Sequence, residues 1–462
     1  MIKLQEKGLW PSKGCNMRPK KQEKEIQTRL FSSRLDQILN RKHALFVLAN
    51  EINWKVFDDE FGQLYSENGR PGLPTRVMVG LHYLKHMFNE SDESVVERFI
   101  ENGYWQFFCG FEYFQHEFPI EPSSMSRWRK RIGSDRLKML LSETLETAKR
   151  QKQIGRNEFS RVNVDTTVQE KAVAHPTDAR LYHKARIKLV KAAKERGIKI
   201  RQSYERIGKE TLRKQGRYAH AQQYRRARKM TRKLRGYLGR VKRDIERSGA
   251  EIDRKLADLL EVAGWIYEQK KSDKDKVYSV HALEVECISK GKAHKRYEFG
   301  CKVSIASSSR NNWVMAADAI HSNPYDGHTL EETLESAEKT SGGTIREVFV
   351  DKGYKGAAKD VPEKQVIMTG TRGLSRGMKR WMRRRQAIEP VIGHMKSDNR
   401  MGRNHLHGWE GDRINAILAG CGFNLMKLYR AVALFVSILL WKFAAVFDEN
   451  RSFKARLPES VA

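Results

Sequence analysis

The sequence is poor in cysteine, and the cysteines that it has form no recognisable framework. Its 462 residues include 5 Cys, which are scattered and form no C-x-x-C pair. An odd, scattered set of this kind excludes a disulfide scaffold and a zinc ribbon, and it favours a reducing, cytoplasmic compartment.

Three further features are missing. No G-x-x-x-x-G-K-[ST] loop occurs, so we expect no nucleotide cofactor. The opening MIKLQEKGLWPSKG has no apolar core, so we expect no secretory signal. The apolar run 431–447 is 17 residues long, contains Lys442 and is shorter than the ~20 residues of a membrane span. It predicts a packed C-terminal helix and no membrane partner.

Positive charge is abundant. The chain carries 88 Lys+Arg against 56 Asp+Glu, a formal net charge of +32, which favours a polyanionic partner, with nucleic acid the default. The 9 Trp, 15 Tyr and 19 Phe are too many for a disordered chain. At about 150 residues per domain, the length allows roughly three domains, or two with a large insertion.

Residues 1–155 have the periodicity of helices. The run 73–88 is amphipathic, Ser91 is a candidate N-cap for the next helix, and 123–132 is a short Arg-rich helix opened by Ser123 or Ser124. The order resembles a helix-turn-helix, with Arg127, Arg129, Lys130 and Arg131 expected to face DNA. The alternative is a solvated basic helix packed on Trp128.

From residue 158 the pattern changes to alternation, which predicts strands at 159–169, 277–289, 297–307 and 346–354, with a helix at 328–339. The second and third strands are expected to pair as a hairpin. Strands followed by helix and strand predict an α/β core covered by helices.

A basic segment separates the first two strands. Residues 180–247 contain 25 Lys+Arg and 5 Asp+Glu, a net charge of +20 (25 − 5), with apolar residues at helical spacing and no proline. We interpret these long helices as a phosphate-backbone surface, represented by Arg225, Arg226, Arg228, Lys229, Arg232 and Lys233. A solvated face is the alternative.

Three acidic residues stand in a context that favours chemistry. Asp165 lies near the end of the first predicted strand, Asp351 ends another, and Glu389 lies in a basic helical stretch. Two carboxylates on neighbouring strands and one from a helix could hold two Mg²⁺ ions for in-line phosphoryl transfer. For a single Asp at a strand end, a cap or a turn is the better explanation, and the combination of the three is what favours chemistry.

Other candidates are weaker. Asp318, Asp326 and Asp398 are rival carboxylates, of which Asp326 is most simply a turn residue after Asn-Pro-Tyr and Asp398 an ion-pair partner. His405 and His407 form an H-x-H without a partner at zinc spacing, which favours phosphate contact or packing over a metal role.

Together these segments resemble the DDE transposases of bacterial insertion sequences. Arg385, Glu389 and Lys396 match the R, E and K of the family pattern Y-x2-R-x3-E-x6-K, whereas Met382, next to Trp381, stands at the Tyr place. The D-T-T at Asp165, the D-x-G-Y from Asp351 to Tyr354 and the block 70–85 match as well. The similarity covers about residues 30–430.

The resemblance implies an architecture. It consists of a helical N-terminal DNA-binding domain (1–155), an RNase H-like catalytic domain (156–430) interrupted by a basic helical insertion (176–275), and a C-terminal helix and tail (431–462). Asp165, Asp351 and Glu389 are then the metal ligands, for two Mg²⁺ ions with Mn²⁺ as a substitute. Arg385 and Lys396 are expected to hold phosphates, since Arg forks onto phosphate and Lys supplies a point charge. Tyr354 and Trp381 are candidates for stacking on a base, with core packing the alternative.

The resemblance also implies an activity. The protein is expected to bind the terminal inverted repeats of a mobile element, to cut phosphodiester bonds and to join 3′-hydroxyls to target DNA, as a homo-oligomer when it synapses ends. Its place would be the bacterial cytoplasm, associated with the nucleoid. The alternatives are a metal-dependent structure-selective nuclease and a non-catalytic DNA-binding protein.

Overall fold

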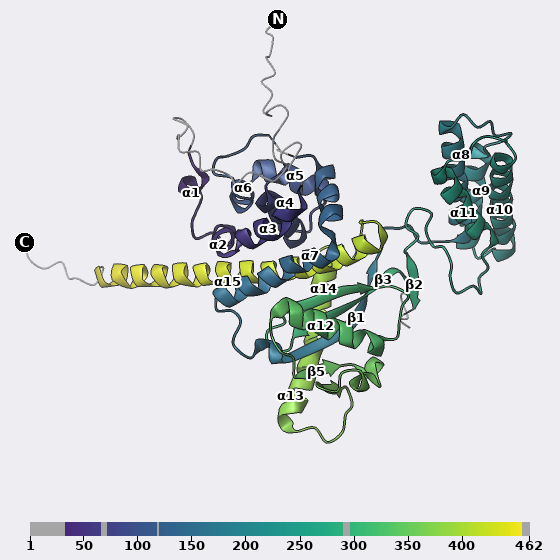
Figure 1. Cartoon of the computed structure of the whole chain (residues 1–462). Helices are drawn as coiled ribbons and strands as arrows, with labels where there is room; N and C mark the ends of the chain where they lie inside the picture. The colour runs from purple at the N-terminus through teal and green to yellow at the C-terminus, as the bar shows by residue number, and fades with distance from the viewer. Residues whose placement is uncertain (1–32, 66–71, 118–119, 290–295, 455–462) are drawn as a thin grey trace, which may run out of the picture.

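The structure is a computed structural model, and it describes residues 33–65, 72–117, 120–289 and 296–454, the last stretch by its backbone alone from 435 onward. Figure 1 shows an N-terminal group of helices, a mixed sheet with helices on it, and a helical bundle that stands apart. One long helix, α15, runs between the N-terminal helices and the sheet.

The N-terminal group contains the helices that the sequence predicts. Ser91 caps α5 by accepting a hydrogen bond from the Ser94 amide at 3.0 Å, as predicted. The Arg-rich helix is the first part of α7, which begins at Pro122 rather than at a serine and is interrupted by Gly133, whose φ of +75° breaks the helical path. The elements are α1 (Leu35–Ile38), α2 (Ala44–Glu51), α3 (Trp54–Phe61), η1 (Gly62–Leu64), α4 (Thr75–Met87), α5 (Asp92–Glu101), α6 (Gly103–Phe108) and α7 (Pro122–Arg150).

Within the described residues, the sheet has six strands. Its order is β2-β3-β1-β5-β6, with β4 also paired to β3. β5 runs parallel to β1, and β6 runs parallel to β5, whereas β3 is antiparallel to β1, β2 and β4. The strands are β1 (Arg161–Glu170), β2 (Glu286–Ser289), β3 (Tyr297–Ser308), β4 (Val314–Ile320), β5 (Glu347–Val350) and β6 (Gln365–Met368), with the short helices η2 (Glu158–Ser160), η3 (Asp326–Thr329), η4 (Lys352–Tyr354) and η5 (Ala357–Lys359) and the helix α12 (Leu330–Ser341) around them.

The predicted hairpin is only partly correct. β2 and β3 do pair, but β2 covers Glu286–Ser289, and residues 277–285 form no strand. This segment connects two bodies: Val280 packs into the core of the basic bundle, and Val285 is buried beside the sheet. The K-G-K-A-H loop at 290–294 lies outside the described residues.

The basic segment forms a bundle with its own core. Its helices are α8 (Asp178–Glu195), α9 (Glu205–His220), α10 (Tyr224–Glu246) and α11 (Arg254–Glu268). Leu189, Leu238 and Ile266 belong to a hydrophobic cluster whose buried members all lie within residues 179–280. The bundle is therefore a second folded body inserted between β1 and β2, as Figure 1 shows.

The C-terminal elements are α13 (Arg376–Arg384), η6 (Arg385–Ala387), α14 (Ile388–Ser397) and α15 (Gly408–Lys454). Of these, α14 packs against β1 and α15 against β4. α15 begins at Gly408, so the apolar run 431–447 is part of a longer helix, and its packing from 435 onward lies outside the described side chains. α15 crosses α4 at Gly422, where a β-carbon would lie 2.6 Å from the His86 carbonyl oxygen. Only glycine allows this approach.

Within the described part of the chain, one helical segment, Gly408–Leu434, is long and apolar enough to cross a membrane by length and composition alone. Half of its apolar window is buried inside the protein.

Candidate active site

Asp165 and Asp351 lie on neighbouring parallel strands of the sheet. In the register of β1 and β5, Asn163 pairs with Phe349, and Asp351 directly follows the last residue of β5, Val350. The pairing of β1 with β5 ends at Asn163 and Phe349, and Asp165 and Asp351 each lie two residues beyond this last pair; the charges of both act on Tyr354. Adjacent strands are about 4.8 Å apart, so the two carboxylates belong to one small region at the end of β5.

Each carboxylate is held by nearby donors. Asp165 accepts a hydrogen bond from the Thr166 amide at 2.8 Å and from Arg385 Nη2 at 3.2 Å. Arg385 is only 8% exposed, so this ion pair is largely shielded from water. Asp351 accepts a hydrogen bond from the Gly353 amide at 2.8 Å, which begins η4. Arg385 thus lies at the predicted site. It was expected to bind a phosphate, but in this structure it binds the Asp165 carboxylate.

Tyr354 is fully buried next to these residues, with 0% of its surface exposed. Burial, together with the charges of Asp165, Asp326 and Asp351, raises the pKa of Tyr354 well above that of an ordinary tyrosine. A ring buried in this way offers no face to a base, so the expectation that Tyr354 stacks on DNA is wrong. Of the two alternatives, core packing is correct.

Asp326, interpreted from the sequence as a turn residue, has contacts beside Asp165 that the sequence did not predict. It does begin a turn, η3, but its Oδ1 also accepts hydrogen bonds from Thr166 Oγ1 at 3.0 Å and from Lys302 Nζ at 2.8 Å. Thr166 directly follows Asp165, so Asp326 is bonded to β1 one residue from Asp165. The signal in the sequence was an Asp after an Asn-Pro turn, which is typical of turns and gives no hint of this contact.

Glu389 lies in the first turn of α14 and is exposed. It is four residues after Arg385 along the continuous helical stretch of η6 and α14, so both side chains are on one face, about 5–6 Å apart at their β-carbons. Lys396 is half-buried near the end of α14. Among the described residues, no group of three or more His, Cys, Asp or Glu side chains is placed to hold a metal ion.

The other rival residues have structural partners. Asp318 forms an ion pair with Lys138 at 2.7 Å, and Asp398 bonds to His394 Nδ1 at 2.8 Å. His407 packs near the ring of His281, with centroids 6.2 Å apart.

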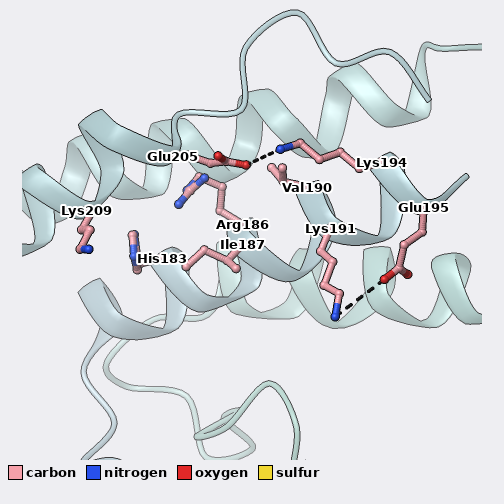
Figure 2. Close-up of a pocket in the computed structure, with 9 residues that line it drawn as sticks. All are labelled: His183, Arg186, Ile187, Val190, Lys191, Lys194, Glu195, Glu205 and Lys209. Atoms are coloured by element: carbon pink, nitrogen blue, oxygen red, sulfur yellow. Dashed lines mark hydrogen bonds and ion pairs between the residues drawn. The ribbon is translucent and has the colours of Figure 1, made fainter. Parts of the chain in front are cut away.

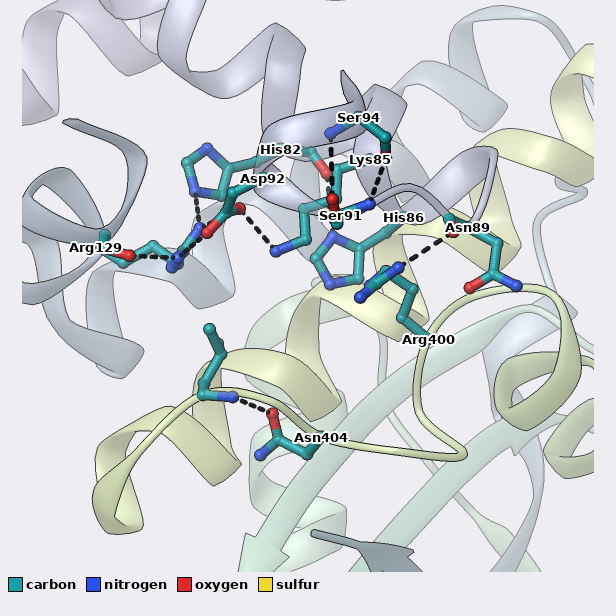
Figure 3. Close-up of polar contacts among 12 residues, drawn as sticks. His82, Lys85, His86, Asn89, Ser91, Asp92, Ser94, Arg129, Arg400 and Asn404 are labelled. Atoms are coloured by element: carbon teal, nitrogen blue, oxygen red, sulfur yellow. Dashed lines mark hydrogen bonds and ion pairs between the residues drawn. The ribbon is translucent and has the colours of Figure 1, made fainter. Parts of the chain in front are cut away.

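The Arg-rich helix has an outer and an inner side. Arg127, Lys130 and Arg131 are exposed, whereas Arg129 is 3% exposed and points inward. Figure 3 shows Arg129 next to Asp92 and His82; its nitrogens lie 2.9 and 2.6 Å from the Asp92 oxygens. The expectation that Arg129 faces DNA is therefore wrong, because the period of the helix turns it toward the core.

The basic bundle exposes all six predicted cations of α10, namely Arg225, Arg226, Arg228, Lys229, Arg232 and Lys233. Residues 211–243, which form the hairpin of α9 and α10, contain 13 Lys+Arg and no acidic residue. We call this stretch the basic hairpin.

Elsewhere on the bundle the cations are partly neutralised. Figure 2 shows a pocket of about 490 Å³ between α8 and α9, where Lys191 pairs with Glu195 and Lys194 pairs with Glu205. The basic hairpin is therefore the longest run of cations without an acidic residue, although Lys214 and Lys242 near its ends pair with Glu210 and Glu246.

Trp381, the second stacking candidate, is half-buried in α13. The Arg161 guanidinium lies over its ring, 5.2 Å from the centroid.

Comparisons with known proteins agree with this arrangement. The family described as "Transposase domain (DUF772)" matches residues 33–131, and the family described as "Transposase DDE domain" matches residues 268–425, which include Asp351 and Glu389. A protein of Rhizobium meliloti described as "Uncharacterized protein ORF8 in nfe locus" is 55% identical over 195 residues, 42% of this chain and 94% of that protein. No solved structure matches.

A mixed α/β sheet with acidic residues on adjacent strands, preceded by a matched transposase domain, defines a DNA-acting transposase. The chain belongs to the DDE transposases of the insertion-sequence type. Its DDE domain is of a kind that in general has an RNase H-like fold and uses divalent metal ions, and transposases are typically soluble cytoplasmic proteins.

Proposed function

We propose that this chain binds the terminal inverted repeats of an insertion sequence, cleaves phosphodiester bonds and transfers the 3′-hydroxyl ends to target DNA. The observation that carries the proposal is the pairing of β1 with β5, since Asp165 and Asp351 each lie two residues beyond the last pair, with Arg385 of the neighbouring helical segment bonded to Asp165. The match to the transposase DDE domain supports this kind of chemistry.

The donor set suits a hard divalent cation. Asp165, Asp351 and Glu389 supply carboxylate oxygens, the ligands that Mg²⁺ prefers, and Mn²⁺ accepts the same set. A β-carbon at Gly353 would lie 2.9 Å from Asp351 Oδ1, so the absent side chain leaves this carboxylate open on that side. When bound, two such ions activate the attacking oxygen and stabilise the leaving oxygen of an in-line displacement.

The residues of the chain orient the DNA. Arg385 and Lys396, which belong to the same helical segment as Glu389, are suited to hold the phosphates that flank the scissile bond. Arg127, Lys130 and Arg131 present an exposed basic face for the element's end, and the basic hairpin supplies phosphate contacts that do not depend on base sequence. A homo-oligomer bound to the nucleoid would bring two ends together.

The decisive experiment is the change Asp351→Ala in the full-length protein. We expect cleavage of a duplex that carries the DNA flanking the reading frame to be abolished and binding to that duplex to be largely retained, because the phosphate contacts that we propose come from basic side chains and not from this carboxylate. The control is Asp318→Asn. It removes a carboxylate of the same sheet, one that is paired with Lys138 of α7, and it should retain cleavage. An equal loss of binding by Asp351→Ala would make Asp351 a structural residue.

A second assay separates transposition from nuclease activity. Wild-type protein given pre-cut ends and a circular target should join the 3′-hydroxyls to the target. Cleavage without joining would identify a structure-selective nuclease, and binding without cleavage would identify a non-catalytic DNA-binding protein.

A further inference from the structure

The basic bundle has another pocket, different from that of Figure 2, at the end of α10. Its volume is about 800 Å³, and it is lined by the last turns of α10 and by residues of the connection between α8 and α9. Five of the side chains that line it are cations, namely Lys199, Arg201, Arg240, Arg243 and Arg247. We call it the arginine pocket.

The positive charge of the arginine pocket is largely uncompensated. Among the described residues that line it, Asp244 is the one acid. Asp244 is engaged by Arg201, whose amide donates to it at 2.6 Å and whose Nε lies 3.6 Å from its other oxygen. The other four cations form no ion pair within the described part of the chain. The pocket therefore concentrates positive charge in a concave surface, where a polyanion would be attracted.

The cations converge on the pocket from two segments. Arg240, Arg243 and Arg247 follow one another at intervals of three and four residues along α10, so they share a face, where like charges repel. The dipole of α10 favours cations in its last turn. It does not account for Lys199 and Arg201, which come from the connection between α8 and α9. Convergence from two segments predicts a ligand with several negative charges.

Tyr204 adds an aromatic ring to the lining of the pocket. The ring is half-buried, stacks on Tyr237 with centroids 4.6 Å apart, and accepts a hydrogen bond on its hydroxyl from Arg240 at 3.3 Å. Tyr204 is also the N-cap of α9 with a φ of +55°, a left-handed conformation that residues other than glycine seldom adopt. The fold thus holds a fixed aromatic ring among the cations, at the expense of local backbone preference.

The size of the arginine pocket selects among forms of DNA. A cube of the same volume has an edge of about 9 Å. The major groove of B-DNA alone is ~12 Å wide, so a duplex reaches only the rim of the pocket, whereas a single strand can enter it. Sites for single strands combine cations for the phosphates with aromatic rings on which bases stack, and the arginine pocket has both.

We propose that the arginine pocket binds an unpaired DNA strand, whose phosphates contact the arginines and one of whose bases stacks on Tyr204. The inference rests on the proposed function, because it takes DNA as the polyanion that the protein handles. It assigns two sites to α10. Arg228 of the basic hairpin and Arg243 of the pocket are 15 residues apart, about 22 Å along the helix, so the two sites are separable by substitution.

The test is the affinity of the full-length protein for two labelled probes, measured by fluorescence anisotropy against salt concentration. One probe is an oligothymidylate of about 10 nucleotides, within the ~4–16 that single-strand sites cover, and the other is a hairpin duplex. Arg243→Gln with Arg247→Gln should weaken binding of the oligothymidylate about tenfold or more, because each removes a charged hydrogen bond to phosphate. The log–log salt slope should fall by about 1.4, at about 0.7 for each contact with a single strand.

The matched control removes two charges from the other end of the same helix. Arg225→Gln with Arg228→Gln should weaken binding of the duplex more than that of the oligothymidylate, the reverse of the pocket variant. All four arginines are exposed, so neither variant should disturb the fold. If the two variants weaken both probes equally, the bundle is a uniform basic surface. The inference is then overturned, and the proposed function stands.

Substitutions of Tyr204 test the stacking. Tyr204→Leu should weaken binding of the oligothymidylate about tenfold, within the range measured for the loss of one stacked base. It should leave the salt slope unchanged, because the ring carries no charge. Tyr204→Phe keeps the ring and should keep the affinity. Equal losses by the two variants, or no loss by Tyr204→Leu, would overturn the stacked base.

A third probe separates a DNA strand from a free polyphosphate. If inorganic tripolyphosphate binds the wild-type protein as tightly as the oligothymidylate does, and Tyr204→Leu changes neither affinity, the ligand is a free polyphosphate and the inference is overturned. If the wild-type protein binds neither the duplex nor the oligothymidylate, the proposed function fails together with the inference.

Discussion

Arg127 and Arg129 are two residues apart on one helix and have opposite surroundings. Arg127 is exposed and donates hydrogen bonds only to the hydroxyls of Ser123 and Ser124. Arg129 is buried on Asp92, which also pairs with Lys85 at 2.7 Å, and these two cations hold the pKa of Asp92 well below its usual range despite the opposing effect of burial. The cluster is therefore a structural one, inside the helical group.

We predict that Arg129→Met lowers the free energy of unfolding by about 3 kcal/mol, because removing one partner of a buried ion pair leaves the other charge poorly compensated. Asp92 still pairs with Lys85 in this variant, so the loss of stability stays near the lower end of the ~3–5 kcal/mol that is usual for breaking a buried ion pair. Arg127→Met, the matched control, should change stability by less than about 0.5 kcal/mol but weaken binding to end DNA. Denaturant unfolding and DNA titration of both variants check this, and equal stabilities would contradict the buried pair.

At the scale of elements, the sequence predicts those helices and caps whose positions depend on local periodicity. The helix at 73–88, the Ser91 cap and the helices of the basic segment follow from spacing and capping chemistry, and the structure confirms them. The contacts of Asp326 could not be predicted, because its partners Thr166 and Lys302 are 160 and 24 residues away and meet it only when β1, β3 and η3 come together. The inward side of Arg129 likewise depends on the position of Asp92.

The two buried histidines of helix α4 predict how the stability of the protein depends on pH. Every residue of α4 except Arg76 is buried, and burial lowers the pKa of His82 to about 3 and that of His86 well below the usual value. In the unfolded chain both would titrate near 6.5. Below that pH the unfolded state binds more protons than the folded state, so stability is complete above pH ~6.5 and falls as the pH is lowered toward the folded values.

The expected slope is about 1.4 kcal/mol per pH unit for each of the two histidines, between pH ~6.5 and ~4.5, above the range where carboxylates titrate. His82→Gln and His86→Gln should each remove one such contribution, whatever they do to stability at pH 7.5. Unfolding free energies measured at several pH values would show this as a change of slope between variant and wild type. Identical slopes would mean that these rings are protonated in the folded protein.

At the scale of the whole molecule, the chain has one shared core and one separate core. The hydrophobic cluster of the N-terminal helices continues into the sheet and α15; it includes Leu84, Leu141, Val164 and Leu425. A fragment ending near residue 155 would lose much of that core, so recognition of DNA ends is best tested in the full chain. The basic bundle, by contrast, has its own cluster and is joined to the sheet by two connections.

The two connections lie close together. The end of β1, at Glu170, and the start of β2, at Glu286, both pair with Gly300 of β3, on its opposite sides. They are thus two strand spacings apart, about 10 Å. A Gly/Ser linker of about six residues spans that distance. Replacing residues 176–280 with such a linker therefore keeps the buried Lys171–Glu284 ion pair and the sheet.

We predict that this deletion variant folds and still prefers end DNA to random DNA, but binds both more weakly and with a flatter dependence on salt. Each phosphate contact contributes about 0.9 to the log–log slope on duplex DNA, and the basic hairpin supplies contacts that do not distinguish sequences. Neutralising Arg225, Arg226, Arg228, Lys229, Arg232 and Lys233 together should give part of the same effect, whereas Lys191→Gln with Lys194→Gln, whose charges are already paired, should give little. The measurement is the binding constant of each variant as a function of salt concentration. An unchanged slope after the deletion would mean that these charges face solvent. A loss of the preference for end DNA would mean that the bundle, and not the N-terminal helices, recognises the ends.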